Sequence, residues 1–437
     1  MTSRRALLLL ATSLLAACGG GDERRAEAPA ATAPGAALTT AAPAAAPKPA
    51  PATPPAPVRD ALDGGPFPAL LVTQAHFLET VGPDGKPQPV PGPARLVIVR
   101  DSGTGWHKVV VDDPDSNVFH KAMPWDGGIL TIGGNKALLR TWRFANGAWT
   151  SETHWNPVFG GKHNRLRDVE QGDVDGDGKV ELVIATHDQG VIAIVHPDEQ
   201  WRVEEVDKAP NTFVHEIEIG DVDGDGAPEF FATPSHPNKL DQEQPGEVTM
   251  FRRENGRWVE SVVDAPGDTH AKEILAADVD GDGTAELYVV WEGAVAQGGA
   301  LVRPVTIKAY RWKDGKPESS VVATVPDRQM RSIAAGDVNG DGKIDLVAGA
   351  LATGIYLFEQ QGDGTWKSTV IDKASSGYEH PVYLADLDGD GTAEIYVASE
   401  DQGELRRYRF ENGAFVKTVL LPLSASDITW NVTSGKL

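Results

Sequence analysis

The sequence is poor in several residue types, and each shortage excludes a class of protein. Only one of the 437 residues is a cysteine, which excludes intramolecular disulfides and cysteine-rich zinc sites. Basic residues are outnumbered, with 40 Lys and Arg against 63 Asp and Glu, and the formal net charge is -23. Nucleic-acid binders usually carry a basic surface, so we expect no nucleic-acid partner. The sequence also has no Gly-x-Ser-x-Gly nucleophile elbow, phosphate-binding loop or dinucleotide fingerprint.

The longest apolar run lies at the amino terminus and is too short to span a membrane. It extends from Ala6 to Ala17, after a basic pair, whereas a spanning helix needs roughly 20 residues. The sequence 15–19, Leu-Ala-Ala-Cys-Gly, resembles the lipobox of bacterial lipoproteins. This resemblance implies that residues 1–17 are a signal peptide, that Cys18 is lipidated, and that the protein is exported and held at the outer membrane, on its periplasmic face or at the cell surface. The alternative is an ordinary signal peptide followed by an incidental cysteine.

The next segment, residues 18–58, has the composition of a flexible tether. It is almost entirely Ala, Pro, Gly and Thr, and Leu38 and Val58 are its only large apolar side chains. Such a segment cannot bury enough apolar surface to offset the entropy lost on folding. We therefore expect one folded domain, residues 60–437, and we expect it to be monomeric.

Within that domain a nine-residue acidic pattern, Asp-x-Asp/Asn-Gly-Asp-Gly-x-x-Asp/Glu, occurs five times. The copies begin 48, 57, 59 and 49 residues apart, at Asp173, Asp221, Asp278, Asp337 and Asp386. A period near 50 residues indicates an array of supersecondary units in one repeat fold. Each copy is followed by a short apolar run, such as 182–185 or 395–398, which predicts a strand buried on both faces.

A second marker gives a blade count of seven. Asn-Gly or Asp-Gly turns, or weaker versions of them, separate strand-like runs near residues 103–106, 146–149, 198–201, 255–258, 314–315, 363–366 and 412–415. Acidic loops occur at only six positions, including a remnant at Asp126. We infer that the strand-like segment 427–432 completes a first blade whose other three strands come from about residues 66–113. The prediction is an all-β, seven-bladed β-propeller closed by its carboxy-terminal strand.

The acidic loops resemble those of FG-GAP or VCBS repeats, the propeller blades also seen in integrin α-chains. EF-hands are excluded because position 12 of each loop is apolar and lies in a predicted strand. The resemblance implies five structural calcium sites and none in the first two blades; the alternative is solvated acidic turns without metal. The implied ligands are Asp173, Asp175, Asp177, Glu181, Asp221, Asp223, Asp225, Glu229, Asp278, Asp280, Asp282, Glu286, Asp337, Asn339, Asp341, Asp345, Asp386, Asp388, Asp390 and Glu394.

A basic residue stands six positions before each loop, where an inner strand should begin. These residues are His120, Arg167, His215, Lys272, Arg331 and His380. In a propeller they would surround the mouth of the central channel, together with His76, His163, His187, His236 and His270. Such a ring suits an anionic or polyhydroxylated ligand, or a transition metal held by imidazoles. The alternative is a ring neutralised by nearby acids such as Asp168, Glu216, Glu273 and Glu379. Long connections at 75–95, 233–247 and 291–302 are expected around this mouth.

Three functions remain open at this point. The first is a membrane-anchored lipoprotein that binds a glycan, another anionic ligand or a protein partner at the channel mouth. The second is an enzyme, because some propellers of similar fold are carbohydrate lyases or sugar dehydratases. Its base would be His215, His380 or Tyr378, and its enolate-neutralising cation Arg331 or Lys272. The third is a structural adhesion module.

Overall fold

The computed structural model describes residues 67–83, 85–161, 164–187, 189–237, 244–296 and 299–437. The predicted signal peptide, Cys18, the tether and His163 lie outside these ranges. The described residues form strands β1 to β30 and a single turn of 3-10 helix, η1 (Pro197–Glu199). No helix within these ranges is long and apolar enough to cross a membrane.

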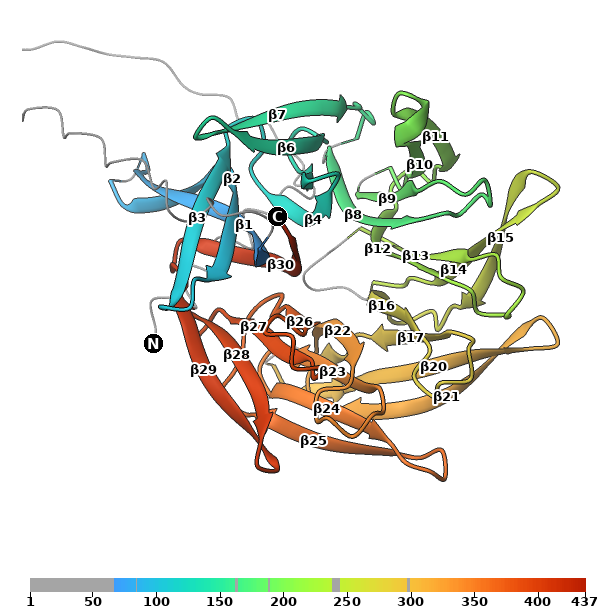
Figure 1. Ribbon diagram of the computed structural model, residues 1–437. Coiled ribbons are helices and arrows are strands. Elements are labelled where there is room, and N and C mark those ends of the chain that lie inside the picture. Colours follow the sequence, from blue (N-terminus) through green and yellow to red (C-terminus); the bar gives the residue numbers. More distant parts are fainter. Residues whose placement is uncertain (1–66, 84, 162–163, 188, 238–243, 297–298) are drawn as a thin grey trace, which may run out of the picture.

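Seven four-stranded antiparallel sheets stand around a common centre (Figure 1). The prediction of an all-β, seven-bladed β-propeller is therefore confirmed.

The strand bounds follow the chain blade by blade. The first blade contains β1 (Pro68–Val81), β2 (Pro87–Asp101), β3 (Trp106–Asp113) and β30 (Asp427–Lys436), and the second contains β4 (Phe119–Trp125), β5 (Gly128–Gly133), β6 (Leu139–Ala145) and β7 (Ala148–Trp155). The third contains β8 (Arg165–Gly172), β9 (Glu181–His187), β10 (Ile192–His196) and β11 (Arg202–Asp207), and the fourth contains β12 (Phe213–Gly220), β13 (Glu229–Ser235), β14 (Val248–Glu254) and β15 (Arg257–Asp264). The fifth contains β16 (Ala271–Ala277), β17 (Glu286–Trp291), β20 (Val305–Lys313) and β21 (Lys316–Val325), the sixth β22 (Met330–Gly336), β23 (Asp345–Ala350), β24 (Gly354–Gln360) and β25 (Trp366–Asp372), and the seventh β26 (Val382–Ala385), β27 (Glu394–Ser399), β28 (Glu404–Glu411) and β29 (Ala414–Pro422).

In the second to seventh blades, the second strand is buried along almost its whole length between the neighbouring sheets. Every residue of β9, β17 and β27 is buried, as the continuous apolar runs predict. Side chains of one sheet pack on those of the next; for example, Val183 of β9 and Phe230 of β13 share one apolar cluster. The outer hairpins turn at residues with positive φ, such as Asn146 and Gly147 at 55° and 79°, which is the backbone that Asn-Gly turns favour.

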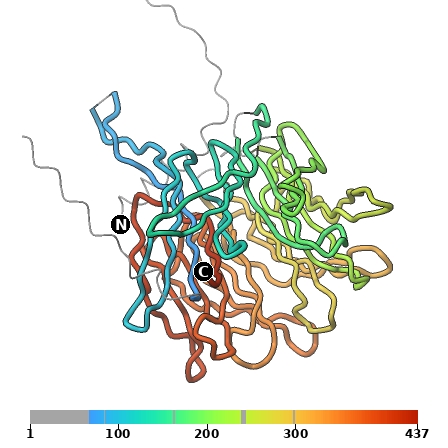
Figure 2. Tube along the Cα trace, turned by 45° about the horizontal axis from the view of Figure 1, so that its top comes forward, coloured from blue at the N-terminus to red at the C-terminus, as the bar shows by residue number. Residues whose placement is uncertain are grey.

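The two ends of the described chain meet in the first blade. Strand β30 pairs antiparallel with β1 and forms the inner edge of that sheet, with Val72 opposite Val432. Phe67 and Leu437 exchange two backbone hydrogen bonds of 3.0 and 3.1 Å. The amino-terminal strands and the last strand accordingly lie side by side in Figure 2. The sheet closes as the spacing of the acidic loops predicts.

The long connections differ from one another. Much of 75–95 continues as strand, because β1 extends to Val81 and β2 begins at Pro87, and the resulting hairpin projects from the propeller (Figure 2). The connection after Trp291 forms a small sheet of its own from β18 (Ala294–Val295) and β19 (Leu301–Arg303). Residues 238–243 of the remaining connection lie outside the described ranges.

Candidate functional site

The five acidic loops share one backbone geometry. In the first of them, Gly176 and Gly178 donate backbone hydrogen bonds of 2.8 and 2.9 Å to the two carboxylate oxygens of Asp173. Both glycines have positive φ, a conformation that other residues rarely adopt. The same pair of bonds, from 2.7 to 2.9 Å long, recurs in the loops that begin at Asp221, Asp278, Asp337 and Asp386.

The ninth residue of each loop is a buried acid that points into the loop. Glu181 is 0% exposed, and one of its carboxylate oxygens accepts no hydrogen bond; the same holds for one oxygen each of Asp345 and Glu394. Burial and then the neighbouring loop carboxylates raise the pKa of both Glu181 and Asp345 to about 7. Buried oxygens without partners, arranged around a tight turn, fit a cation.

Several of the predicted ligand sets are close enough to hold one ion. In each of three loops the first three acids lie with ligand atoms within 4.8 Å of one another, and so do Asp386, Asp388 and Glu394 of the last loop. The sequence interpretation missed three arginines on third strands that contact these acids. Arg252 and Arg311 lie 2.8 and 2.9 Å from Glu229 and Glu286, and Arg409 lies 2.9 Å from Asp388. Each of these arginines lies on the third strand opposite the ninth acid of its loop, and this recurring position is the sequence signal that could have identified them.

At the other end of the inner strands, the residues predicted to surround the channel mouth lie at β-bulges. The register of the inner strand shifts around His120, Arg167 and Lys272. It also shifts across segments that contain His215, Arg331 and Trp430. A bulge places an extra residue in one strand and re-aims its side chain. Six of the seven inner strands therefore direct a side chain out of their ladder at the same level of the propeller.

These side chains form a circuit, which we call the mouth cluster: His120, Arg167, His187, His215, His270, Lys272, Glu292, Arg331, Glu379 and Trp430. On one side, the ring of His120 contacts Trp430 edge-on at 5.0 Å, and Trp430 lies under the Arg167 guanidinium at 5.4 Å. Arg167 Nη2 in turn lies 4.0 Å from Glu379 Oε2.

The circuit continues through Arg331, which donates to Glu379 at 2.8 Å and to Glu292 at 2.9 Å. On the histidine side, His270 Nε2 lies 3.5 Å from Glu292, and its ring lies 6.0 Å from that of His215. His215 shares a hydrogen bond of 3.1 Å with His187, whose ring is 6.4 Å from His120. The side chains of the mouth cluster therefore pack against one another, and most of them are buried.

Lys272 is buried in the mouth cluster near two arginines and two glutamates. This lysine is 6% exposed, and burial followed by repulsion from Arg331 lowers its pKa to about 7. Burial, followed by nearby cations, also lowers the pKa of His120, His187 and His215 well below 6.5, so these imidazoles are neutral. An anion next to Lys272 would relieve this repulsion.

The alternative of a ring neutralised by its neighbours is partly correct. Glu379 contacts two arginines of the mouth cluster, and Glu216 lies 3.4 Å from Arg167. Asp168 instead pairs with Lys121 at 3.0 Å, and Glu273 accepts a hydrogen bond of 3.3 Å from the backbone N–H of Ile333.

Two predicted residues do not take the places expected of them. His380 is 0% exposed, precedes β26 with a φ of 48°, and hydrogen-bonds to Ser375 and to the carbonyl of Ala350, both at 2.7 Å. It is part of the packing of the seventh blade and makes none of the contacts that link the mouth cluster. The Tyr378 ring lies beneath the Arg331 guanidinium at 4.7 Å, so it supports that cation.

The remaining histidines do not complete a metal site at the mouth. His76 pairs with Asp427 at 2.6 Å in the first blade, and the backbone N–H of His236 bonds to Pro245. Among the described residues, every trio of histidine or acidic ligands with atoms within 4.8 Å includes loop acids, and none joins three imidazoles. The hypothesis of a transition metal held by mouth imidazoles therefore gains no support here.

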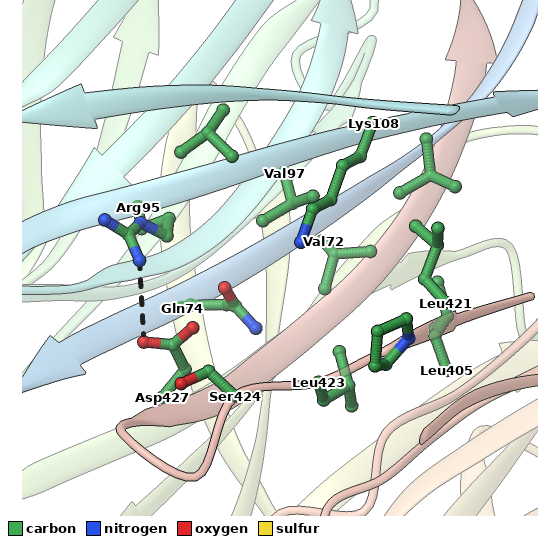
Figure 3. Close-up of a pocket in the computed structure, with 13 residues that line it drawn as sticks. Val72, Gln74, Arg95, Val97, Lys108, Leu405, Leu421, Leu423, Ser424 and Asp427 are labelled. Atoms are coloured by element: carbon green, nitrogen blue, oxygen red, sulfur yellow. Dashed lines mark ion pairs between the residues drawn. The ribbon is translucent and has the colours of Figure 1, made fainter. Parts of the chain in front are cut away.

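A separate small pocket lies at the seam between the first and last blades (Figure 3). Its volume is about 110 Å³, and its lining is mostly apolar, with Val72, Val97 and Leu421 among its residues. Arg95 and Asp427 face each other across it at 3.7 Å and link β2 to β30. This pocket is best explained by imperfect packing where the ring closes.

The comparisons with known proteins support the repeat structure. A protein-family model described as "FG-GAP-like repeat" matches residues 173–232, 221–289 and 337–397. No curated protein matches the chain. Similar solved structures include two proteins described as candidate 6-phosphogluconolactonases, each 12% identical and each covering 84% of this chain. The one from Bacteroides fragilis NCTC 9343 has a TM-score of 0.49 over 98% of its length, and the one from Bacteroides uniformis ATCC 8492 has 0.53 over 99%. At 12% identity, the likeness to the Bacteroides uniformis structure shows the fold alone. The chain is thus a seven-bladed β-propeller that carries FG-GAP-like repeats.

Proposed function

We propose that this chain is a non-catalytic binding module that holds an anionic ligand, such as the uronate groups of an acidic glycan, at the mouth cluster. One observation carries the proposal: successive inner strands bulge so that Arg167, Lys272 and Arg331 converge at one end of the channel. Bulges of this kind are over-represented next to functional sites because they re-aim side chains.

The charge of the cluster supports an anion rather than a cation. Glu292 and Glu379 lie next to the two arginines, and Lys272 is a third cation buried in the same cluster. Burial, and then repulsion from Arg331, lowers the pKa of Lys272 to about 7, although Glu292 and Glu379 act in the opposite sense. A carboxylate or sulfate bound there would form a charge-assisted hydrogen bond with a largely desolvated ammonium group.

Calcium and a lipid anchor complete the proposal. Five Ca²⁺ ions in the acidic loops would neutralise the buried ninth acids and stiffen the blades, at the opposite end of the inner strands from the mouth. Acylation of Cys18, on the resemblance to lipoproteins, would attach the monomeric propeller to the outer membrane by its tether. A protein partner with an acidic surface is the second ligand class that the same cluster suits.

The arrangement of the two candidate histidine bases does not favour a lyase. Both ring nitrogens of His215 are engaged, one with His187 and the other with Ser235 at 3.0 Å. Both nitrogens of His380 are also engaged, with Ser375 and the Ala350 carbonyl. A general base needs a lone pair within reach of the substrate proton, and neither imidazole offers one in this arrangement.

Equilibrium binding to acidic polysaccharides tests the proposal. The full chain, saturated with calcium, is titrated with polygalacturonate and with neutral dextran of similar length, while absorbance monitors unsaturated elimination products. We expect binding to the polyanion alone, without product. Lys272→Met should weaken it about tenfold to a hundredfold, as expected for one hydrogen bond to a charged group.

The matched control is Lys108→Met, because Lys108 is exposed on the outer strand β3. This variant should bind as wild type does. Equal loss in both lysine variants would mean that binding follows overall charge and would overturn the assignment to the mouth. Formation of ultraviolet-absorbing products that depends on His215 would establish the enzyme alternative.

A further inference from the structure

One position on the third strand distinguishes the five acidic loops from one another. It lies opposite the ninth acid of each loop, and in blades four, five and seven it is Arg252, Arg311 or Arg409. In the sixth blade it is Glu359, which lies opposite Asp345 when the pairing of β23 with β24 is continued by one residue. In the third blade it is His196, the only imidazole among the five.

His196 is aimed at the acids of its loop. It is 4% exposed, and its Nδ1 lies 3.8 Å from Glu181 Oε1. That carboxylate oxygen is itself buried and has no hydrogen-bond partner. Ligand atoms of Asp175, Glu181 and His196 all lie within 4.8 Å of one another. The unpartnered oxygen of a fully buried carboxylate is an observation independent of the acidic cluster, and it indicates a position that suits a cation.

Two further charged side chains lie next to these three residues. His196 Nε2 lies 3.7 Å from Glu204 Oε2, so the far side of the ring faces a second carboxylate. Metal-bound imidazoles commonly direct their other nitrogen to a carboxylate, which fixes the tautomer and the ring orientation. Asp175 is held from the next blade by Arg253, at 2.7 Å.

We propose that the third blade contains a mixed nitrogen–oxygen site, formed by His196, Asp175 and Glu181, for a divalent ion of the zinc and cobalt class. Calcium takes oxygen ligands, whereas imidazole together with carboxylates suits zinc and its first-row neighbours. Because Asp175 and Glu181 also belong to the acidic loop, this ion competes with calcium at the third blade and not at the other four. The proposal is independent of the ligand at the mouth cluster.

Cobalt binding in the presence of calcium tests this site. The full chain is stripped with a chelator, saturated with Ca²⁺ and titrated with CoCl₂, and the visible d–d absorption and the heat of binding are recorded. We expect one equivalent of Co²⁺ with a spectrum of mixed nitrogen and oxygen ligation. His196→Ala should lose this equivalent, and His196→Asp, which supplies oxygen in place of nitrogen, should lose it while keeping calcium binding.

The matched control is His154→Ala, because His154 is a part-buried histidine that stacks on Trp201 and points at no acid of the loop. This variant should bind Co²⁺ as wild type does. The proposal is overturned if wild type binds no Co²⁺ in calcium, or if both His196 variants keep the same equivalent and spectrum. Thermal melts in calcium establish whether each variant is folded. If His196→Ala does not fold, His196→Asp provides the test.

Discussion

Replacing Lys272 with methionine should change how the stability of the propeller depends on pH. The folded protein holds this lysine with a pKa of about 7, whereas its ordinary value is 10.5. Below pH 7 the lysine is charged in both the folded and unfolded states, and the folded state carries the full cost of burying that charge. As pH rises from about 7 to 10.5, only the unfolded state stays protonated, so this cost is progressively relieved.

The size of the effect follows from that difference. A gap of this width corresponds to about 5 kcal/mol in total, and the part between pH 7 and pH 9 to about 3 kcal/mol. The free energy of unfolding of wild type should therefore rise relative to that of Lys272→Met as pH increases through this window. Lys272→Met removes the ionisable group, so the stability of this variant should not show the rise. The variant should be more stable than wild type, most clearly below pH 7.

Urea unfolding at pH 6, 7.5 and 9, at fixed ionic strength and saturating calcium, measures this difference. Lys121→Met is the control: although burial opposes it, the carboxylates of Asp168 and Glu170 raise the pKa of Lys121 well above 10.5. Replacing Lys121 leaves the buried carboxylates of Asp168 and Glu170 without the cation that lowers their pKa values, so the stability lost by this variant should grow as pH rises, the opposite of the trend for Lys272→Met. Parallel pH profiles for wild type and Lys272→Met would refute the reasoning.

Three other predictions concern the metal loops, the closure and the anchor. Chelation of calcium should lower the melting temperature and re-addition should restore it, since a ligand at a hundred times its dissociation constant contributes about 2.7 kcal/mol per site; a melt unaffected by chelator would contradict calcium binding. Truncation after Ser424 removes β30 with its buried Ile428 and Val432, and should cost roughly 3–6 kcal/mol of unfolding free energy in denaturant titrations; an unchanged midpoint would argue against closure. Cys18→Ser should move the protein from the membrane to the soluble fraction of producing cells, and wild type in the soluble fraction would exclude the anchor.

Much of the fold is readable from the sequence because the signals are local and repeated. The acidic loops need Gly176, Gly178 and their equivalents at positive φ, so their spacing marks every blade from the third to the seventh. The Asn-Gly hairpins add the outer turns, and counting beyond Asp386 places the last strand in the first blade. None of these inferences depends on side chains that meet across the channel.

The candidate site is less predictable because it depends on such contacts. The spacing of six residues before each loop identifies the bulge positions in the second to sixth blades. It fails for His380, because β26 begins only at Val382 and His380, before the strand, has a positive φ of 48°. The sequence also gives no warning that Glu292 joins the cluster, because this acid comes from the connection after β17 and meets Arg331 only in the folded ring. Trp430 joins the same cluster from β30 because the ring closes.

The central claim is that the mouth cluster holds an anion next to Lys272, and the pH dependence of polyanion binding tests it most directly. Titrations of polygalacturonate at pH 6, 7 and 8, in calcium and at constant ionic strength, would give the dissociation constant for wild type and Lys272→Met. Because the bound anion favours the protonated lysine, wild-type affinity should be highest at pH 6 and fall as pH rises through about 7, whereas the variant should bind weakly at every pH. Equal and pH-independent affinities for the two proteins would contradict the account.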